Sequence, residues 1–226
     1  MVRLFRLYPY WGPLLFGPLA VFAWMRHWPN DPALVAVALA VPILHAYVVP
    51  AVGTNVLGMW AFTTRVRIGR FRPHHGFVFG TATALIALPL IGPAEADPSA
   101  ARIVGTGLVV GAVLFLVNWI YDALALRHGL LEVYNQPWSD GAGPWRVALD
   151  YAPWFFGLFG VIWGAGVKLA EARLLGRSDA ATAVAIGAAL VAATITLPTL
   201  GYLLASRLRH GHWGVRPCRP PREAMP

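Results

Sequence analysis

The chain has 226 residues, of which 58% are hydrophobic and only 12% are charged, and its formal net charge is +8. Soluble domains carry roughly 25% charged residues, so this composition excludes an ordinary soluble globular protein and a disordered chain. The single cysteine, Cys218, excludes an intramolecular disulfide framework and a zinc cluster built from cysteines.

Apolar segments long enough to cross a bilayer dominate the chain. A helix needs about 20 apolar residues to cross the hydrocarbon core, because each backbone polar group must be satisfied within the helix. The sequence therefore predicts an all-α integral membrane protein, a polytopic bundle of about six transmembrane helices forming one domain over residues 1–206. The spans are expected near residues 7–25, 33–62, 76–94, 103–122, 151–170 and 180–206.

The second apolar segment, residues 33–64, is too long for one upright span. It contains Pro42 and Pro50, and an interior proline removes a helix hydrogen bond and kinks the axis. Two interpretations follow. Either one long, kinked helix runs to the end of the segment, or the span ends near Pro50 and a re-entrant or interfacial helix continues through Trp60.

The distribution of arginines predicts the orientation. Six spans place both termini on the same side, and 13 of the 18 basic residues lie at that side. Cytoplasmic loops carry an excess of Lys and Arg. Both termini are therefore expected to be cytoplasmic, in a multi-pass protein of the plasma or inner membrane. Residues 207–226 are expected to form a basic tail, rich in Pro and His, that is disordered or lies on the surface.

The basic charge is best explained by the membrane. Residues 65–75 alternate basic and apolar side chains immediately before the third span. Such clusters attract anionic headgroups by about 1 kcal/mol for each basic residue, so membrane lipids are expected partners. An anionic substrate group, such as a phosphate, is the alternative ligand. No nucleic-acid-binding motif accompanies the charge, so nucleic acid is not expected to bind.

Two features suggest membrane anchors. Trp24 and Trp28 are expected at the outer interface, where indole rings sit at the headgroup level. Lys168, the only lysine, is expected to extend its ammonium group outward from the end of the fifth span.

Small residues four positions apart predict close helix packing. Gly107 and Gly111 form one such pair, and Gly160 and Gly164 form another. This spacing lets two helix backbones approach closely. A homo-oligomer, or packing against a partner in a membrane complex, is the alternative use of these faces.

His45 is the one ionisable residue in the middle of a predicted span. Such residues are costly in a bilayer and are functional candidates by default, although a neutral imidazole bonded to a neighbouring helix is the plainer interpretation. Candidate ligands for a divalent metal are His45, His74, His75 and His128. The other histidines lie at the interfaces or in the tail, so the sequence argues against a bis-histidine haem.

The densest group of polar residues follows the fourth span. If that helix continues past Leu126, His128 and Glu132 lie at i and i+4 on one face, while Asn118 and Asp122 form a similar pair on the adjacent face. A carboxylate beside a histidine suits general acid–base chemistry or metal binding; plain solvation is the alternative. The candidate catalytic residues are Asp122, His128 and Glu132. The candidate substrate-binding residues are Arg70, Arg72, Asn118, Tyr121, Tyr134, Asn135 and Trp138.

These residues favour an integral membrane enzyme without determining its reaction. The expected substrate is lipid-soluble, an isoprenoid or acyl lipid, and the expected chemistry at the cytoplasmic interface is carboxylate/His acid–base or metal-assisted. DDxxD, G-x-S-x-G, Walker A and HExxH motifs are absent. Two alternatives stay open: a non-catalytic subunit or assembly factor of a membrane complex, and a small-solute transporter, since Pro42 and Pro50 fit a broken-helix site.

Overall fold

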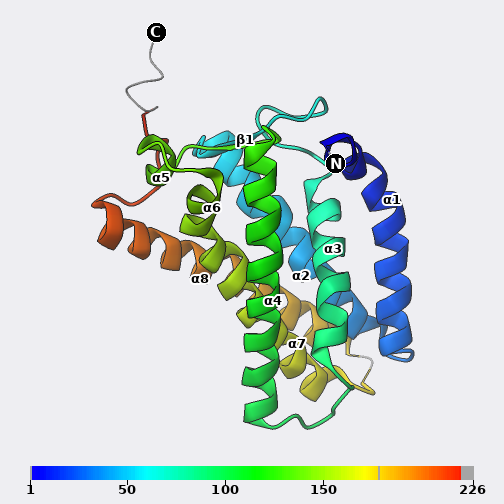
Figure 1. Cartoon of the computed structure of the whole chain (residues 1–226). Coiled ribbons are helices and arrows are strands. Elements are labelled where there is room, and N and C mark those ends of the chain that lie inside the picture. The colour runs from blue at the N-terminus through cyan, green and yellow to red at the C-terminus, as the bar shows by residue number, and fades with distance from the viewer. Residues whose placement is uncertain (1, 178, 220–226) are drawn as a thin grey trace.

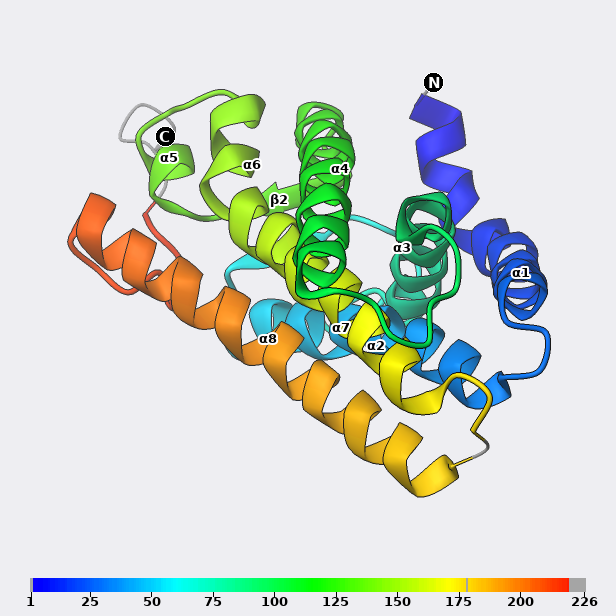
Figure 2. The ribbon, with the colours of Figure 1, turned by 90° about the horizontal axis from the view of Figure 1, so that it is seen from below.

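A computed structural model describes residues 2–177 and 179–219, and these residues are mostly helical (Figure 1). Helices α1, α3 and α4 run roughly alongside one another, whereas α7 and α8 cross them obliquely (Figures 1 and 2), and a two-stranded antiparallel sheet lies at one end of the bundle. The elements in chain order are α1 (Val2–His27), α2 (Pro32–Ala51), the π-helical segment η1 (Val52–Val56), β1 (Trp60–Phe62), α3 (His75–Ile91), α4 (Ala100–Arg127), β2 (Leu131–Val133), α5 (Gln136–Ser139), α6 (Pro144–Ala152), the π-helical segment η2 (Pro153–Leu158), α7 (Phe159–Leu174) and α8 (Ala180–His210).

Four helices in the described residues are long and apolar enough to cross a membrane. They are Pro32–Val56, Ala100–Arg127, Pro144–Leu174 and Ala180–His210, and each agrees with a predicted span. The prediction of an all-α fold is confirmed. Helix α3 is apolar but has only 17 residues, and α1, which is continuous over 26 residues, is not among the four.

The second apolar segment behaves differently from both interpretations of it. The helix passes through Pro42 and Pro50, continues as η1 to Val56, and then gives way to strand β1. The ring of Trp60 packs so tightly on Gly53 that a Cβ there would lie 2.0 Å from a ring carbon. The chain therefore turns back on itself after η1, and neither a helix to residue 64 nor a helix through Trp60 forms.

Strands β1 and β2 close one end of the bundle. They pair antiparallel, with Trp60 opposite Val133 and Phe62 opposite Leu131. Figure 1 shows the start of α1 at this same end. The tail reaches it as well, because the backbone N–H of Cys218 donates to the Tyr134 carbonyl at 2.8 Å.

Helix α7 is the centre of the bundle and packs on α4, α2 and α8 (Figure 2). The small-residue pattern predicted the α4–α7 contact correctly. A Cβ added to Gly107 would lie 2.7 Å from the Val161 carbonyl oxygen, and one on Gly160 would lie 2.8 Å from the Gly111 Cα. Larger side chains would push these two backbones apart.

At the end of the bundle opposite the β1–β2 sheet (the far end), the residues predicted to be membrane anchors are buried instead. Trp24 and Trp28 are buried rather than interfacial, and the Trp24 indole donates to the Ala84 carbonyl at 3.2 Å. Lys168 is fully buried. Its ammonium group is 2.7 Å from both the Pro93 carbonyl oxygen and the Glu171 carboxylate, so it does not extend outward.

The C-terminal tail starts later than predicted and is folded where the structure describes it. Helix α8 continues to His210, four residues past the predicted end of the span. Residues 211–219 then turn back, and the Ser206 hydroxyl donates to the His212 carbonyl at 2.9 Å. The rest of the predicted tail, residues 220–226, lies outside the described residues.

Candidate active site

A cavity of about 1010 Å³ lies at the end of the bundle where β1 and β2 pair. It is bordered by α2, η1, these two strands, α4, η2 and α8. Most of its lining is aliphatic or aromatic. Ligand pockets in proteins usually measure about 300–1,000 Å³, so this space is large enough for a sizeable molecule. The polar side chains in its lining include His45, Arg72, His75, Tyr121, Asp122, Asn135, Tyr151 and Tyr202.

Asp122, on α4, is the carboxylate held within this lining. The Tyr151 hydroxyl, on α6, donates to its Oδ2 atom at 2.8 Å. No hydrogen bond to Oδ1 occurs in the described part of the chain. Tyr151 therefore fixes the carboxyl group and leaves its second oxygen for a ligand. The sequence suggested Asp122 but not Tyr151, which there resembled a further interfacial aromatic residue.

The N-terminal helix contributes to the same site. The hydroxyl groups of Tyr8 and Tyr121 are hydrogen-bonded to each other, and their rings meet edge to face with centroids 6.1 Å apart. Helix α1 is thereby attached to α4 one residue before Asp122. Tyr8 had no signal in the sequence that separated it from the neighbouring aromatic residues.

Arg72 lies just before α3 and is only 5% exposed. One terminal nitrogen of its guanidinium group is 2.7 Å from His75 Nδ1, and its Cζ is 4.9 Å from the centre of the Phe62 ring. Its Nε atom is buried and has no hydrogen-bond partner. Because a guanidinium group only donates, His75 Nδ1 must be the acceptor, and neutral His75 carries its proton on Nε2.

Two histidines complete the polar lining. The His75 ring lies between Phe62 and Phe79, with centroid distances of 4.7 and 5.8 Å. His45, on α2, is 3% exposed and packs on Phe159. Its Nδ1 atom is buried without a partner. A buried ring nitrogen without a hydrogen bond is costly unless a ligand or water meets it.

His128 and Glu132 do not reach the cavity. The expected helical stripe through them is wrong, because α4 ends at Arg127. Gly129, at φ +64°, turns the chain, and the Leu130 N–H donates to the Ala125 carbonyl at 2.8 Å. This is a Schellman ending, whose sequence signal is a glycine followed by an apolar residue. Glu132 instead lies exposed on β2.

The predicted substrate-binding residues divide into two groups. Arg72, Tyr121 and Asn135 line the cavity. Arg70 does not: it is exposed and donates to the Gly58 carbonyl at 3.3 Å. Asn118 is buried against its own helix and donates to the Leu114 carbonyl at 2.8 Å.

Tyr134 and Trp138 lie in the segment that follows strand β2. Their rings meet edge to face with centroids 5.1 Å apart. The Tyr134 hydroxyl donates to Glu132. Burial and the neighbouring Glu132 carboxylate raise the pKa of Tyr134 to about 12, so its phenol stays protonated at neutral pH. Neither ring lines the cavity.

The histidines proposed as metal ligands do not gather. The ring of His74 packs against Tyr10, with centroids 5.1 Å apart, whereas His75 turns toward Arg72. Within residues 2–177 and 179–219, no three His, Cys, Asp or Glu side chains lie close enough together to hold a metal ion.

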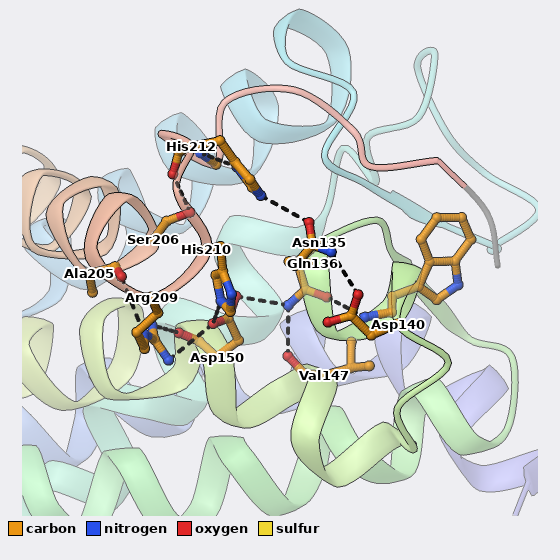
Figure 3. A network of polar contacts seen from close by, with 12 residues as sticks. Asn135, Gln136, Asp140, Val147, Asp150, Ala205, Ser206, Arg209, His210 and His212 are labelled. Carbon is orange, nitrogen blue, oxygen red and sulfur yellow. Dashed lines mark hydrogen bonds and ion pairs between the residues drawn. The ribbon is translucent and has the colours of Figure 1, made fainter.

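A second polar network attaches the tail to the loop that carries α5 and α6 (Figure 3). The Asn135 amide donates to Asp150 at 3.1 Å, and the same carboxylate is 3.1 Å from both Arg209 and His210 on α8. His212 is 3.1 Å from the Gln136 side-chain oxygen. This network brings residues 214 and 215 of the tail into the cavity wall.

Comparisons of the chain with known protein families, with curated proteins and with solved structures find no match. What this protein does is therefore inferred from its own residues.

Proposed function

We propose that this protein crosses the membrane six times, with both termini on the cytoplasmic side. Four helices have the length and composition of spans. Figure 1 shows α1 and α3 running alongside α4. The excess of arginine on the side of the β1–β2 sheet supports a cytoplasmic level for the cavity by the positive-inside rule.

We further propose that the protein is an enzyme that acts on a lipid-soluble substrate in this cavity. The observation that carries the proposal is the Asp122–Tyr151 pair, whose 2.8 Å hydrogen bond fixes a carboxyl group within a mostly apolar lining. A carboxyl group in an apolar site is a common general acid or base. Asp122 accepts or donates the proton through Oδ1, and Tyr151 holds it in position.

The opposite end of the bundle favours an enzyme over a transporter. There the indole rings of Trp24, Trp28 and Trp163 pack together, with neighbouring centroids 5.0 and 6.5 Å apart. All three side chains are buried in the hydrophobic core. A site that is closed at one end suits a molecule that enters and leaves at the same level, whereas release on the other side of the membrane would require these packed rings to separate.

The experiment compares the lipids that remain bound to the gently extracted protein, identified by native mass spectrometry. Asp122→Asn should hold a lipid mass that wild type lacks, because substrate enters the cavity but is not converted. Removing a general acid or base slows turnover about 100- to 10,000-fold, which is enough for substrate to accumulate.

Glu132→Gln is the matched control, because this carboxylate is exposed on β2 and outside the cavity. It should bind the same lipid masses as wild type. Identical masses in wild type and Asp122→Asn would refute the role of Asp122. A new mass in Glu132→Gln alone would move the chemistry to Glu132, on the exposed face of strand β2, which is also a candidate catalytic residue from the sequence.

A further inference from the structure

We infer that the molecule bound in the cavity is an amphiphile with one anionic head, a carboxylate or a phosphate monoester, and that Arg72 and His75 bind this head. The inference rests on the proposed function and specifies the chemical class of its substrate. It concerns binding, so it can be tested without knowledge of the reaction.

The first argument is the unbalanced charge of Arg72. Its guanidinium group is always protonated, and burying a charge without a counter-ion costs several kcal/mol. In the described part of the chain, no carboxylate lies within the 4.0 Å ion-pair distance of Arg72. Asp122 interacts with it electrostatically from farther away. An anionic ligand would supply the missing partner.

The second argument is the contrast with Lys168, the other cation buried in the described residues. Lys168 has a carboxylate at 2.7 Å and a carbonyl oxygen at the same distance. The fold therefore pairs the buried cation that lies outside this cavity, and leaves Arg72, which lines it, without a carboxylate at ion-pair distance.

The third argument is the set of hydrogen-bond donors that remain unused. Arg72 Nε is buried without an acceptor. His75 uses Nδ1 to accept from Arg72, which leaves its protonated Nε2 as a donor with no partner in residues 2–177 and 179–219. An arginine fork with a neighbouring N–H donor matches the oxygens of a carboxylate or a phosphate. A neutral head with a single ester oxygen would leave these donors unmatched.

The rest of the cavity requires that the ligand also carry a long apolar part. Val48, Val52, Leu57, Phe155 and Leu203 are among the residues that line the cavity and offer no polar side chain. A free inorganic anion would leave this surface empty. A head bound at Arg72 places the adjoining carbon atoms in the same cavity as Asp122, which is the group proposed to react.

The test measures equilibrium binding to purified protein in nanodiscs of neutral phosphatidylcholine. The probes are oleate, oleyl phosphate and methyl oleate, which share one chain length and differ in the head. Oleate or oleyl phosphate should bind with one molecule per chain, and methyl oleate at least about 10-fold more weakly, because each ionic hydrogen bond contributes about 1.5–3 kcal/mol. The tighter of the two anions identifies the head as carboxylate or phosphate.

Arg72→Gln should weaken binding of the preferred anion by about 10- to 100-fold and leave methyl oleate unchanged. Arg70→Gln is the matched control, because Arg70 lies on the same loop but is exposed and outside the cavity, and it should bind like wild type. Equal binding of oleate, oleyl phosphate and methyl oleate to wild type would overturn the inference even if Arg72→Gln failed to fold. Unchanged anion binding by folded Arg72→Gln would do the same.

Asp122→Asn separates this inference from the proposed function. It should bind the anion at least as tightly as wild type, because it keeps Arg72 and removes a carboxyl group. Tight, Arg72-dependent binding together with identical lipid masses in wild type and Asp122→Asn would keep the anion site and reject the enzyme. A new lipid mass in Asp122→Asn without anion preference would keep the enzyme and reject the anionic head.

Discussion

The two ends of the bundle each bury charged residues, but they do so in opposite ways. At the far end, Glu171 accepts hydrogen bonds from Lys168, from the Trp28 indole and from the Glu95 backbone. At the end where β1 and β2 pair, Arg72 has no carboxylate within ion-pair distance among the described residues, and it lines a cavity. A fully partnered buried charge holds a structure together, whereas a buried charge without a counter-ion beside a cavity is consistent with the anion site proposed above.

The largest expected effect comes from breaking the partnered cluster. Glu171→Gln removes the carboxylate but leaves the buried Lys168 ammonium group. Because that charge then has no counter-ion, the free energy of unfolding should fall by about 3–5 kcal/mol, measured by denaturant titration in mixed micelles. The double variant Lys168→Met/Glu171→Leu should lose less, since no charge stays buried. A double variant less stable than the single one would contradict this account.

The next effect concerns the contact between α4 and α7, which connects the two ends. Gly111→Ala would place its Cβ 2.5 Å from a Val161 methyl carbon and 2.7 Å from the Gly157 carbonyl oxygen. The overpacking should lower the free energy of unfolding by about 1–3 kcal/mol. Gly105→Ala, on the same helix with nothing within 4 Å of the new Cβ, should raise the free energy of unfolding by about 0.5–1 kcal/mol, because alanine favours a helix over glycine. Equal losses in both variants would show that the close contact with α7 is not the cause.

A smaller effect is expected at the cavity, and its small size sharpens the comparison. Arg72→Gln removes a buried cation that has no carboxylate beside it, so little stabilisation is lost. Because the cost of burying that charge disappears with it, the free energy of unfolding should not fall, even though anion binding is lost. A loss as large as that of Glu171→Gln would show that Arg72 is structural and that the two ends are alike.

The smallest effect lies at the start of α8. Hydrogen bonds from the Thr182 side chain and backbone lower the pKa of Asp179 below its ordinary value of 3.8. A lowered pKa in the folded state stabilises the protein above pH 3.8, and this contribution disappears as the pH falls through the lowered value. Asp179→Ala should therefore lower the melting temperature slightly at pH 7, and the difference from wild type should shrink below pH 3.8. A difference that does not depend on pH would exclude the charge as its source.

The sequence predicted the helical segments well because a membrane span needs a long apolar run, which is visible without structure. The ends of the segments were harder. The Schellman ending at Gly129 stopped α4 before Glu132, although a glycine followed by leucine was a readable signal. Lys168 was expected to extend outward because it lies near the end of an apolar segment, and only the packing of α1 and the α3–α4 loop shows that it pairs with Glu171 instead.

The candidate site was only partly readable. Asp122 was found because it ends an apolar run, and Arg72 because it belongs to a basic cluster. Which arginine of that cluster is buried depends on strand β1. Phe62 of this strand packs on Arg72, while Arg70 is exposed and donates to the Gly58 carbonyl. Tyr8 and Tyr151 meet Tyr121 and Asp122 through contacts more than 25 residues apart, which no local pattern encodes.

The π-helical segment η2 has a consequence for counting residues along the helix that contains it. Tyr151 and Gly160 both face α4, one through Asp122 and the other through Gly111. Nine residues of regular α-helix make about 2.5 turns, which would set these two residues on opposite faces. The wider turns of η2 absorb about one residue and bring Gly160 back toward the side of Tyr151. A chain one residue shorter between these positions would therefore keep both contacts with regular α-helical turns in place of η2, whereas a regular helix of the present length would lose either the tyrosine at the carboxylate or the glycine in the groove.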